Sequence, residues 1–313
     1  MTPPLATTSC WGLCSTIKAP ADEILRFAAH HLELGAHRLY IYLDDDNPAA
    51  FTPLKAHPKI RVTHCDTAYW KKQGARPKKH QVRQTKNATH AYNRRVEVDW
   101  LIHIDVDEFL WPDTNVADIL TLLSSDIHCA RARPIESIAG DGTLFKGYIP
   151  SGPDRAEIVR QIYPTFGAYI KGGFLSHVVG KLFVRTGKEN VLLKIHNMFW
   201  NDEMNPGHTE LNNLALCHCH SKNWQDWLST YRYRLEKGSY RADLAPSTSG
   251  GVTLHDMFHQ IENKHGEAGL RAFYDEVCAD SEKLRKNLQT RGLLRQCDLE
   301  LDRKAKKHFP DFF

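Results

Sequence analysis

The stretch LIHIDVDEFL (residues 101–110) decides the fold. It begins as an apolar run typical of a buried strand, and it then brings three acids, Asp105, Asp107 and Glu108, within four positions. Because an unpaired carboxylate is costly to bury, we expect a cation at the end of this strand. Successive strand residues point to opposite faces, so Asp105 and Asp107 are predicted to share one face.

A divalent metal is the cation that this pattern favours. Carboxylate oxygens with open coordination positions suit Mg²⁺ or Mn²⁺, which usually complete their shells with substrate phosphates. The other interpretation is a pair of solvated acids at a strand end, because a short acidic motif is frequent by chance. Glu108 is expected to hydrogen-bond the backbone beside the site, and Phe109 and Leu110 are expected to return to the core.

The stretch lies within a β-α-β pattern. Residues 10–18 (CWGLCSTIK) read as a strand, and residues 19–36 repeat apolar side chains at helical spacing, with Gly35 where a C-cap would lie. Residues 37–48 and 59–66 read as further strands. Alternation of this kind predicts an α/β fold with a mixed, mostly parallel sheet flanked by helices, whose ligands bind beyond the carboxyl ends of the strands.

The later part of the chain is less regular. Residues 68–80 read as a basic loop, either solvated or in contact with phosphate. Residues 145–215 break into short segments, where we expect the second substrate to bind. We predict a catalytic domain over residues 1–222 and a C-terminal helical extension over 223–313, in which an amphipathic stripe faces the core. The stripe consists of Leu270, Phe273, Tyr274, Val277, Leu284 and Leu288.

Composition excludes few classes of protein. The 313 residues include 41 Lys and Arg against 37 Asp and Glu, a mild balance that does not by itself indicate nucleic acid or membrane. The N-terminus lacks the pattern of a secretory leader and no apolar run is long enough to span a bilayer, so we expect a cytoplasmic protein. The eight Cys fit reduced thiols, and their spacing does not favour structural zinc.

Several segments in order carry a resemblance to a known family. KAPADEILRFAAHHLELGAHRLYIYLDDD (18–46) resembles the first β-α-β unit of the family 2-like glycosyltransferases, and WLIHIDVDEFLWP (100–112) resembles their D-x-D-E-F segment. HVVGKLFVRTG, IHN, HCHSKNWQDW and RLEKG are similar to later blocks of the same group, in the same order. The resemblance implies a GT-A (Rossmann-like) fold, a nucleotide-sugar donor and Mn²⁺ or Mg²⁺ as cofactor.

The resemblance also implies roles for single residues. Asp105 and Asp107 would hold the metal against the donor diphosphate, with His218 as a third contact. The donor contacts would be Asp44, at the base or ribose, and its neighbour Asp46. Lys18 is the one residue here that matches the family's Lys-Asn-Glu motif. Lys181 would contact a phosphate or the acceptor, and His177 would line the same pocket. Simpler interpretations remain: Asp44 as a turn residue, Lys181 as a surface charge and His218 as a packing histidine.

The expected reaction moves a sugar to an acceptor hydroxyl with inversion, and it needs a carboxylate base. Four acids are candidates: Glu136, Asp141, Asp202 and Glu203. We favour Asp202 or Glu203, because WNDEMNPGH lies in the irregular region shortly before His218.

The expected partners are a nucleotide-sugar donor, with UDP-sugar first, and a glycan or glycolipid acceptor such as a surface-glycan precursor. We expect no nucleic acid and no transmembrane segment, while a peripheral membrane contact stays open. Two rival functions are a Mg²⁺-dependent phosphohydrolase or nucleotidyltransferase, which would need more converging acids, and a non-catalytic carbohydrate-binding module.

Overall fold

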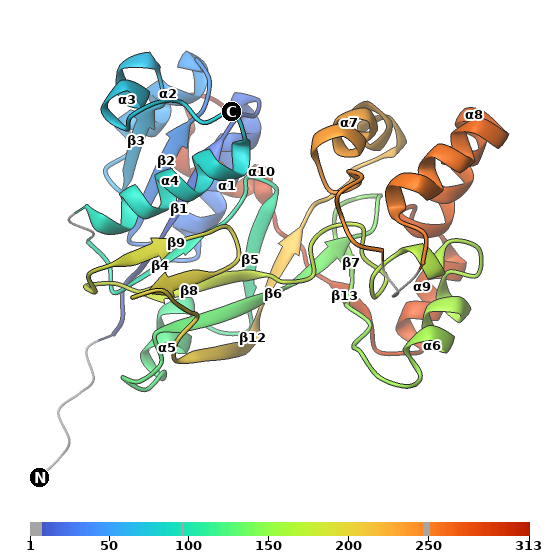
Figure 1. The fold of residues 1–313 in the computed structure, drawn as a ribbon. Helices are drawn as coiled ribbons and strands as arrows, with labels where there is room; N and C mark the ends of the chain where they lie inside the picture. The colour runs from blue at the N-terminus through green and yellow to red at the C-terminus, as the bar shows by residue number, and fades with distance from the viewer. Residues whose placement is uncertain (1–7, 95–96, 247–250) are drawn as a thin grey trace, which may run out of the picture. The chain divides into compact units, whose positions relative to one another are not determined.

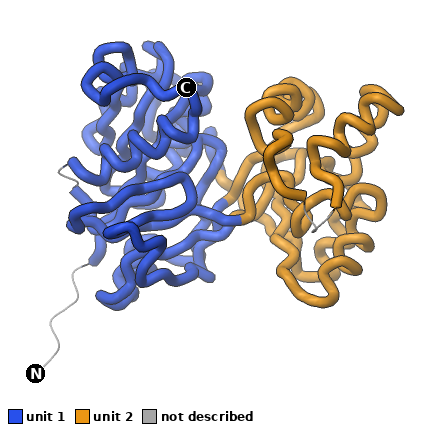
Figure 2. Tube along the Cα trace, in the orientation of Figure 1, with its two compact units in different colours: residues 1–133, 179–216, 300–313 blue, residues 134–178, 217–299 orange. Residues whose placement is uncertain are grey.

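The computed structural model describes residues 8–94, 97–246 and 251–313 (Figure 1). The chain divides into two compact units (Figure 2). Unit 1 comprises the described residues within 1–133, 179–216 and 300–313, and unit 2 those within 134–178 and 217–299. This division differs from the expected boundary between residues 222 and 223, because the chain passes between the units more than once and its last helix belongs to unit 1.

Unit 1 holds the β-α-β pattern that the sequence predicts. Its first half contains β1 (Trp11–Ile17), α1 (Ala21–Glu33), β2 (Arg38–Leu43), α2 (Pro48–Ala56), β3 (Ile60–His64), α3 (Thr67–Lys72), α4 (His80–Asn93), β4 (Trp100–His103), β5 (Glu108–Pro112) and α5 (Val116–Thr121). Then follow β6 (Cys129–Ser137), which continues into unit 2, β8 (Lys181–Arg185), β9 (Val191–Leu193), β10 (Met198–Trp200), β11 (Glu203–Met204), β12 (His208–His218), whose end enters unit 2, and α10 (Leu301–His308).

The sheet of unit 1 runs in the order β6-β8-β4-β1-β2-β3. Strands β4, β1, β2 and β3 are parallel, with Cys14 of β1 opposite His103 of β4 and Tyr40 of β2. Strand β8 runs antiparallel to both β4 and β6. This mixed sheet flanked by helices confirms the predicted α/β, Rossmann-like class.

Local sequence accounts for the first unit of the sheet. Strand β1 is buried along its whole length, as its apolar run predicts. Helix α1 buries Ile24, Phe27 and their apolar neighbours, and it ends before Gly35, whose φ of +87° is the left-handed conformation that a helix end favours. Helix α10 packs beside α1, where Lys307 Nζ lies 2.8 Å from a carboxylate oxygen of Glu33.

Helix α4 covers one face of the sheet of unit 1, across strands β1, β2 and β4 (Figure 1). Its apolar residues Ala88, Ala91 and Tyr92 join Cys14 and Leu101 in one core cluster. Polar residues of α4 also face the sheet, because the Asn87 side chain donates to Thr16 Oγ1 at 3.0 Å and accepts from the Tyr69 hydroxyl at 2.6 Å. Helix α4 is therefore anchored by both packing and hydrogen bonds.

The acidic stretch after β4 is a turn and not a continued strand. Strand β4 ends at His103, and the Glu108 backbone N–H donates to the Asp105 carbonyl at 3.1 Å. Asp105 and Asp107 therefore do not share one face of a strand, and that prediction was wrong. The expectation for Glu108 is confirmed, because its carboxylate accepts from the Asp105 backbone N–H at 2.8 Å. Phe109 and Leu110 are buried, as predicted.

Unit 2 is largely helical. It contains β7 (Leu144–Lys146), α6 (Arg155–Ile162), a short 3-10 helix (Gly167–Tyr169), α7 (Trp224–Lys237), α8 (Leu254–Val277), α9 (Glu282–Gln289) and β13 (Leu294–Gln296). The core of unit 2 includes Trp227 and Tyr231 of α7 with Phe258 of α8. The whole predicted stripe from Leu270 to Leu288 is buried in this core, which confirms the prediction.

Candidate active site

Chemically active side chains gather where the parallel strands of unit 1 end. Lys18 follows β1, Asp44 follows β2 and Asp105 lies just beyond β4. Because these strands are parallel neighbours, their carboxyl ends form one edge of the sheet, which is where ligands bind in folds of this class. Lys18 is exposed, Asp105 is half-buried and Asp44 is buried. The structure therefore brings together three of the residues predicted for the site.

Asp44 is held by cations from the basic loop and α4. Its carboxylate accepts from Arg83 Nε at 2.8 Å and from Arg76 Nη2 at 3.0 Å. Burial alone would raise the pKa of Asp44, but hydrogen bonds from His80 and Arg83 outweigh it and hold the pKa below its usual value. Asp44 is therefore an ionised anchor for the basic loop.

Asp105 lies between a neutral and a cationic partner. Its Oδ2 accepts from Lys181 Nζ at 2.6 Å, and its Oδ1 accepts from the Gln84 side chain. Asp107 follows in the same turn and is half-buried. The two predicted metal ligands thus share a tight turn at the carboxyl edge, and solvent reaches both residues.

The antiparallel pairing of β8 explains why Lys181 reaches this edge. Lys181 begins β8, so it lies beside the end of β4. It is fully buried and also lies 3.3 Å from Glu108 Oε2. Burial alone would lower the pKa of Lys181, but the charges of Asp105 and Glu108 raise it above its usual value. Lys181 is therefore a buried cation that balances the acidic turn, and not a surface charge.

His103 is a further buried group of this edge. It ends β4, and neither of its ring nitrogens has a hydrogen-bond partner among the residues that the structure describes. Burial, helped by the charge of Lys181, lowers the pKa of His103 to about 4, so the ring is neutral at pH 7.

Helix α4 supplies partners to the site that were not predicted from the sequence. His80, Gln84 and Asn87 recur at helical spacing, and all three make contacts on the inner side of α4. Buried polar residues at that spacing would have marked the face of the helix that meets the site.

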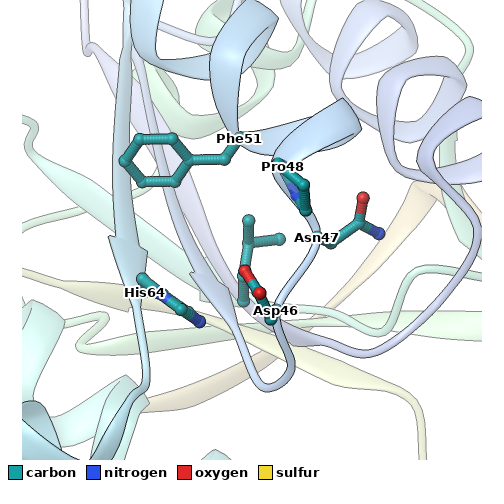
Figure 3. Close-up of a pocket in the computed structure, with 6 residues that line it drawn as sticks. Asp46, Asn47, Pro48, Phe51 and His64 are labelled. Atoms are coloured by element: carbon teal, nitrogen blue, oxygen red, sulfur yellow. The ribbon is translucent and has the colours of Figure 1, made fainter.

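A hollow lies beside this edge, at the ends of β2 and β3 (Figure 3). Its volume is about 120 Å³, and its lining includes Asp46, Asn47 and His64 together with Leu43, Pro48 and Phe51. Asn47 caps α2 by accepting from the Ala50 N–H at 3.1 Å. The hollow contains Asp46, one of the predicted donor contacts, which is exposed.

The predicted histidines lie in unit 2. The rings of His177 and His218 have centroids 5.2 Å apart, and a ligand nitrogen of one lies within 4.8 Å of a ligand nitrogen of the other. His177 is half-buried and His218 is buried. Two imidazoles this close could share one metal ion.

Glu136 holds the segment that leads to His177. Its carboxylate accepts from the Ser176 N–H at 2.7 Å and lies 3.1 Å from Lys146 Nζ. Burial alone would raise the pKa of Glu136, but Lys146 and His220, helped by hydrogen bonds, lower it to about 2. A carboxylate so fully engaged is a structural anchor and not the expected base. Asp141, another candidate, is exposed and caps its own turn at Thr143.

Asp202 and Glu203 belong to a hairpin between β10 and β11. Trp200 pairs with Glu203, so Asn201 and Asp202 form a two-residue turn, with φ of +48° and +65°. Positive φ at both positions defines the type I′ hairpin turn.

This hairpin lies at the amino edge of the parallel strands. The ring of Trp200 packs on His128 at 4.8 Å, and the His128 carbonyl accepts from the Arg185 N–H. Arg185 is opposite Trp100, the first residue of β4. The structure does not bring the two favoured base candidates to the edge that holds Asp105.

Comparisons with known proteins give only distant similarity. No protein-family model and no curated protein matches the chain. Among solved structures, one titled "Crystal Structure of a Mycobacterial Protein" has 11% identity over 56% of this chain and 53% of that chain, with a TM-score of 0.31. Another, titled "WbbM bifunctional glycosytransferase apo structure", has 10% identity over 59% of this chain and 32% of that chain, with a TM-score of 0.27. The matched parts span about half and about a third of those chains.

Within residues 8–94, 97–246 and 251–313, no helix combines the length and the apolar character that crossing a bilayer requires.

Proposed function

We propose that this chain is a metal-dependent glycosyltransferase, which moves a sugar from a nucleoside-diphosphate sugar to a hydroxyl of a glycan or glycolipid. The observation that carries the proposal is the half-buried acidic turn of Asp105 and Asp107, directly beyond the parallel strand β4. The ordered sequence blocks that resemble the family 2-like glycosyltransferases support it independently.

The residues of the turn fit the metal that such a reaction uses. Asp105 and Asp107 offer carboxylate oxygens within reach of solvent, the ligand type that Mn²⁺ and Mg²⁺ prefer. We propose these two as the ligands of the metal. When bound, the metal would neutralise the charge that grows on the leaving diphosphate.

Side chains of the sheet edge supply the other functions. Lys181 holds the acidic turn in place, because its buried charge pairs with Asp105. Lys18 is proposed as a cationic contact of the diphosphate. Asp44 orders the basic loop, and the hollow that contains Asp46 is proposed to receive the nucleoside. In a direct displacement, the acceptor oxygen would bond to the anomeric carbon as the bond to the diphosphate breaks, and the hydroxyl proton would pass to a base, so the anomeric centre would invert.

One assay separates this proposal from its rivals. The protein is incubated with Mn²⁺ and in turn with UDP-, GDP- and CDP-sugars, and the released products are measured. Release of nucleoside diphosphate supports the transferase. Release of inorganic phosphate supports a phosphohydrolase. Sugar binding without turnover of any donor supports a carbohydrate-binding module.

Matched variants connect the activity to the acidic turn. D105N and D107N should each reduce the release of nucleoside diphosphate by about a hundredfold or more, as expected when a metal contact is lost. D113N removes an exposed acid of unit 1 outside the site and should leave the rate unchanged. Equal rates in all three variants would refute the assignment. Removing the metal with EDTA should abolish turnover, and Mn²⁺ should restore it.

A further inference from the structure

Residues 71–86 concentrate the positive charge of the chain. The segment KKQGARPKKHQVRQTK contains seven Lys and Arg and no Asp or Glu. The whole chain has a net charge of +4, so the remaining residues together have a net charge of −3. The modest overall charge therefore hides a strongly basic segment.

The structure divides these seven cations into two groups. Arg76 and Arg83 bind the buried Asp44 carboxylate and fix the loop. The five others are exposed lysines at the end of α3, in the loop and on α4: Lys71, Lys72, Lys78, Lys79 and Lys86. We call these five lysines the basic face. Figure 1 shows α3 and α4, the helices that border it.

We propose that the basic face docks on the surface of an anionic lipid bilayer. Lysine clusters of this size bind anionic lipid headgroups, and each lysine near the surface strengthens binding about fivefold. An anchored loop favours this role, because Asp44 already holds the segment and docking does not have to order it. Val82, an exposed apolar residue between the lysines, suits the same interface.

The chemistry of the face favours lipid over nucleic acid. Binding of single-stranded nucleic acid relies on exposed aromatic rings that stack on bases. Here Trp70 is buried, and the half-buried Tyr69 uses its hydroxyl to hydrogen-bond Asn87. The arginines, which would make bidentate contacts to bases, are engaged by Asp44.

Docking would also serve the proposed function. The basic face borders Asp44, which lies at the same sheet edge as Asp105. A bilayer there would present the hydroxyl of a lipid-linked acceptor to this edge. This last step rests on the proposed glycosyl transfer, whereas docking itself does not.

Vesicle sedimentation without nucleotide sugar tests the proposal. The full chain is mixed with vesicles of phosphatidylcholine alone, or of phosphatidylcholine and phosphatidylglycerol in equal parts, at low and high salt. A variant with Lys71, Lys72, Lys78 and Lys79 all changed to Gln is compared with a control in which Lys55, Lys59, Lys283 and Lys286, also exposed, are changed to Gln. Thermal unfolding confirms that both variants are folded.

We expect the chain to bind the anionic vesicles only, and more weakly at high salt. The basic-face variant should bind these vesicles about a hundredfold or more weakly than the wild type, and the control variant at most a few-fold more weakly. Equal losses in the two variants, or equal binding to both vesicle types, would overturn the proposal. Tighter binding to a DNA oligonucleotide than to anionic vesicles at the same salt would also overturn it. Release of nucleoside diphosphate, measured without vesicles, tests the proposed function separately.

Discussion

Lys181 and Asp105 are 76 residues apart in the sequence, yet the Lys181 ammonium donates to the Asp105 carboxylate at 2.6 Å. The same ammonium lies 3.3 Å from the buried Glu108 carboxylate, which in turn accepts from the Asp105 backbone. A side-chain cation therefore balances part of the charge of the acidic turn after β4. Lys181 ties β8 to the turn after β4.

Changing Lys181 to Met should lower the free energy of unfolding by about 3 to 5 kcal/mol, because it leaves Glu108 buried without its cation. Chemical denaturation measures this loss. K55M removes an exposed lysine of α2 and should cost less than about 0.5 kcal/mol. Adding E108Q to K181M should recover part of the loss, and a further additive loss would contradict the coupling between the two residues.

Gly180, directly before Lys181, allows β8 to approach β6. Its φ is +81°, and a Cβ there would lie 2.2 Å from the Ala132 carbonyl oxygen. Gly187 has a similar φ of +78°, but a Cβ there would meet nothing within 4 Å. G180A should therefore destabilise by about 3 kcal/mol or more, and G187A by only about 1 kcal/mol, the cost of the backbone conformation alone. Equal losses of stability in G180A and G187A, measured by thermal unfolding, would show that the surrounding backbone shifts and relieves the clash at position 180.

Asp44 should control the order of the basic loop. D44N weakens the charge-assisted hydrogen bonds to Arg76 and Arg83, so residues 73–79 should exchange amide hydrogens faster and trypsin should cleave there sooner. Stability should fall by about 2 kcal/mol. D46N changes an exposed acid two residues away, and it should alter neither the mobility of residues 73–79 nor the stability. If both variants exchange alike, Asp44 does not anchor the loop.

The first β-α-β unit could be predicted from the sequence because its signals are local. The apolar run of β1, the helical spacing in α1 and Gly35 at the helix end each lie within a few residues of the structure that they specify. Lys18 and Asp44 were therefore assigned correctly to strand ends.

The contacts across the sheet could not be predicted in the same way. Lys181 reaches Asp105 only through the antiparallel pairing of β8, and Gln84 only through the packing of α4. Asp107 does not lie on a strand as predicted, because the Glu108 carboxylate caps the Asp105 N–H and turns the chain. Helix α3 was expected to be a loop, and it forms because Asp66 caps the Tyr69 N–H at 2.7 Å.

The hairpin position of Asp202 and Glu203 argues against either as the base. D202N and E203Q should each change the release of nucleoside diphosphate by less than about twofold, because both acids lie at the edge away from Asp105. D202G should raise the free energy of unfolding by up to about 1 kcal/mol, since glycine adopts the positive φ of this turn without strain. A large rate loss in D202N or E203Q with unchanged stability would restore the catalytic assignment.

Glu136 should make unit 2 sensitive to acid. Its pKa is about 2 in the folded chain, below its ordinary value near 4.5, so its contribution is present above pH 4.5 and is lost as the pH falls toward 2. The size of that contribution is about 3 kcal/mol. The free energy of unfolding of the wild-type chain should therefore fall more steeply over this range than that of E136Q.

The E136Q variant also tests whether Glu136 positions His177. Its amide oxygen can still accept from the Ser176 N–H but no longer balances Lys146. At neutral pH we therefore expect a lower free energy of unfolding with little change in the NMR shifts of the His177 ring. E157Q, on the exposed face of α6, is the matched control and should follow the wild-type acid profile. If the free energy of unfolding fell with pH equally in E136Q and the wild type, the Glu136 carboxyl would not be ionised beside Lys146 in the folded chain.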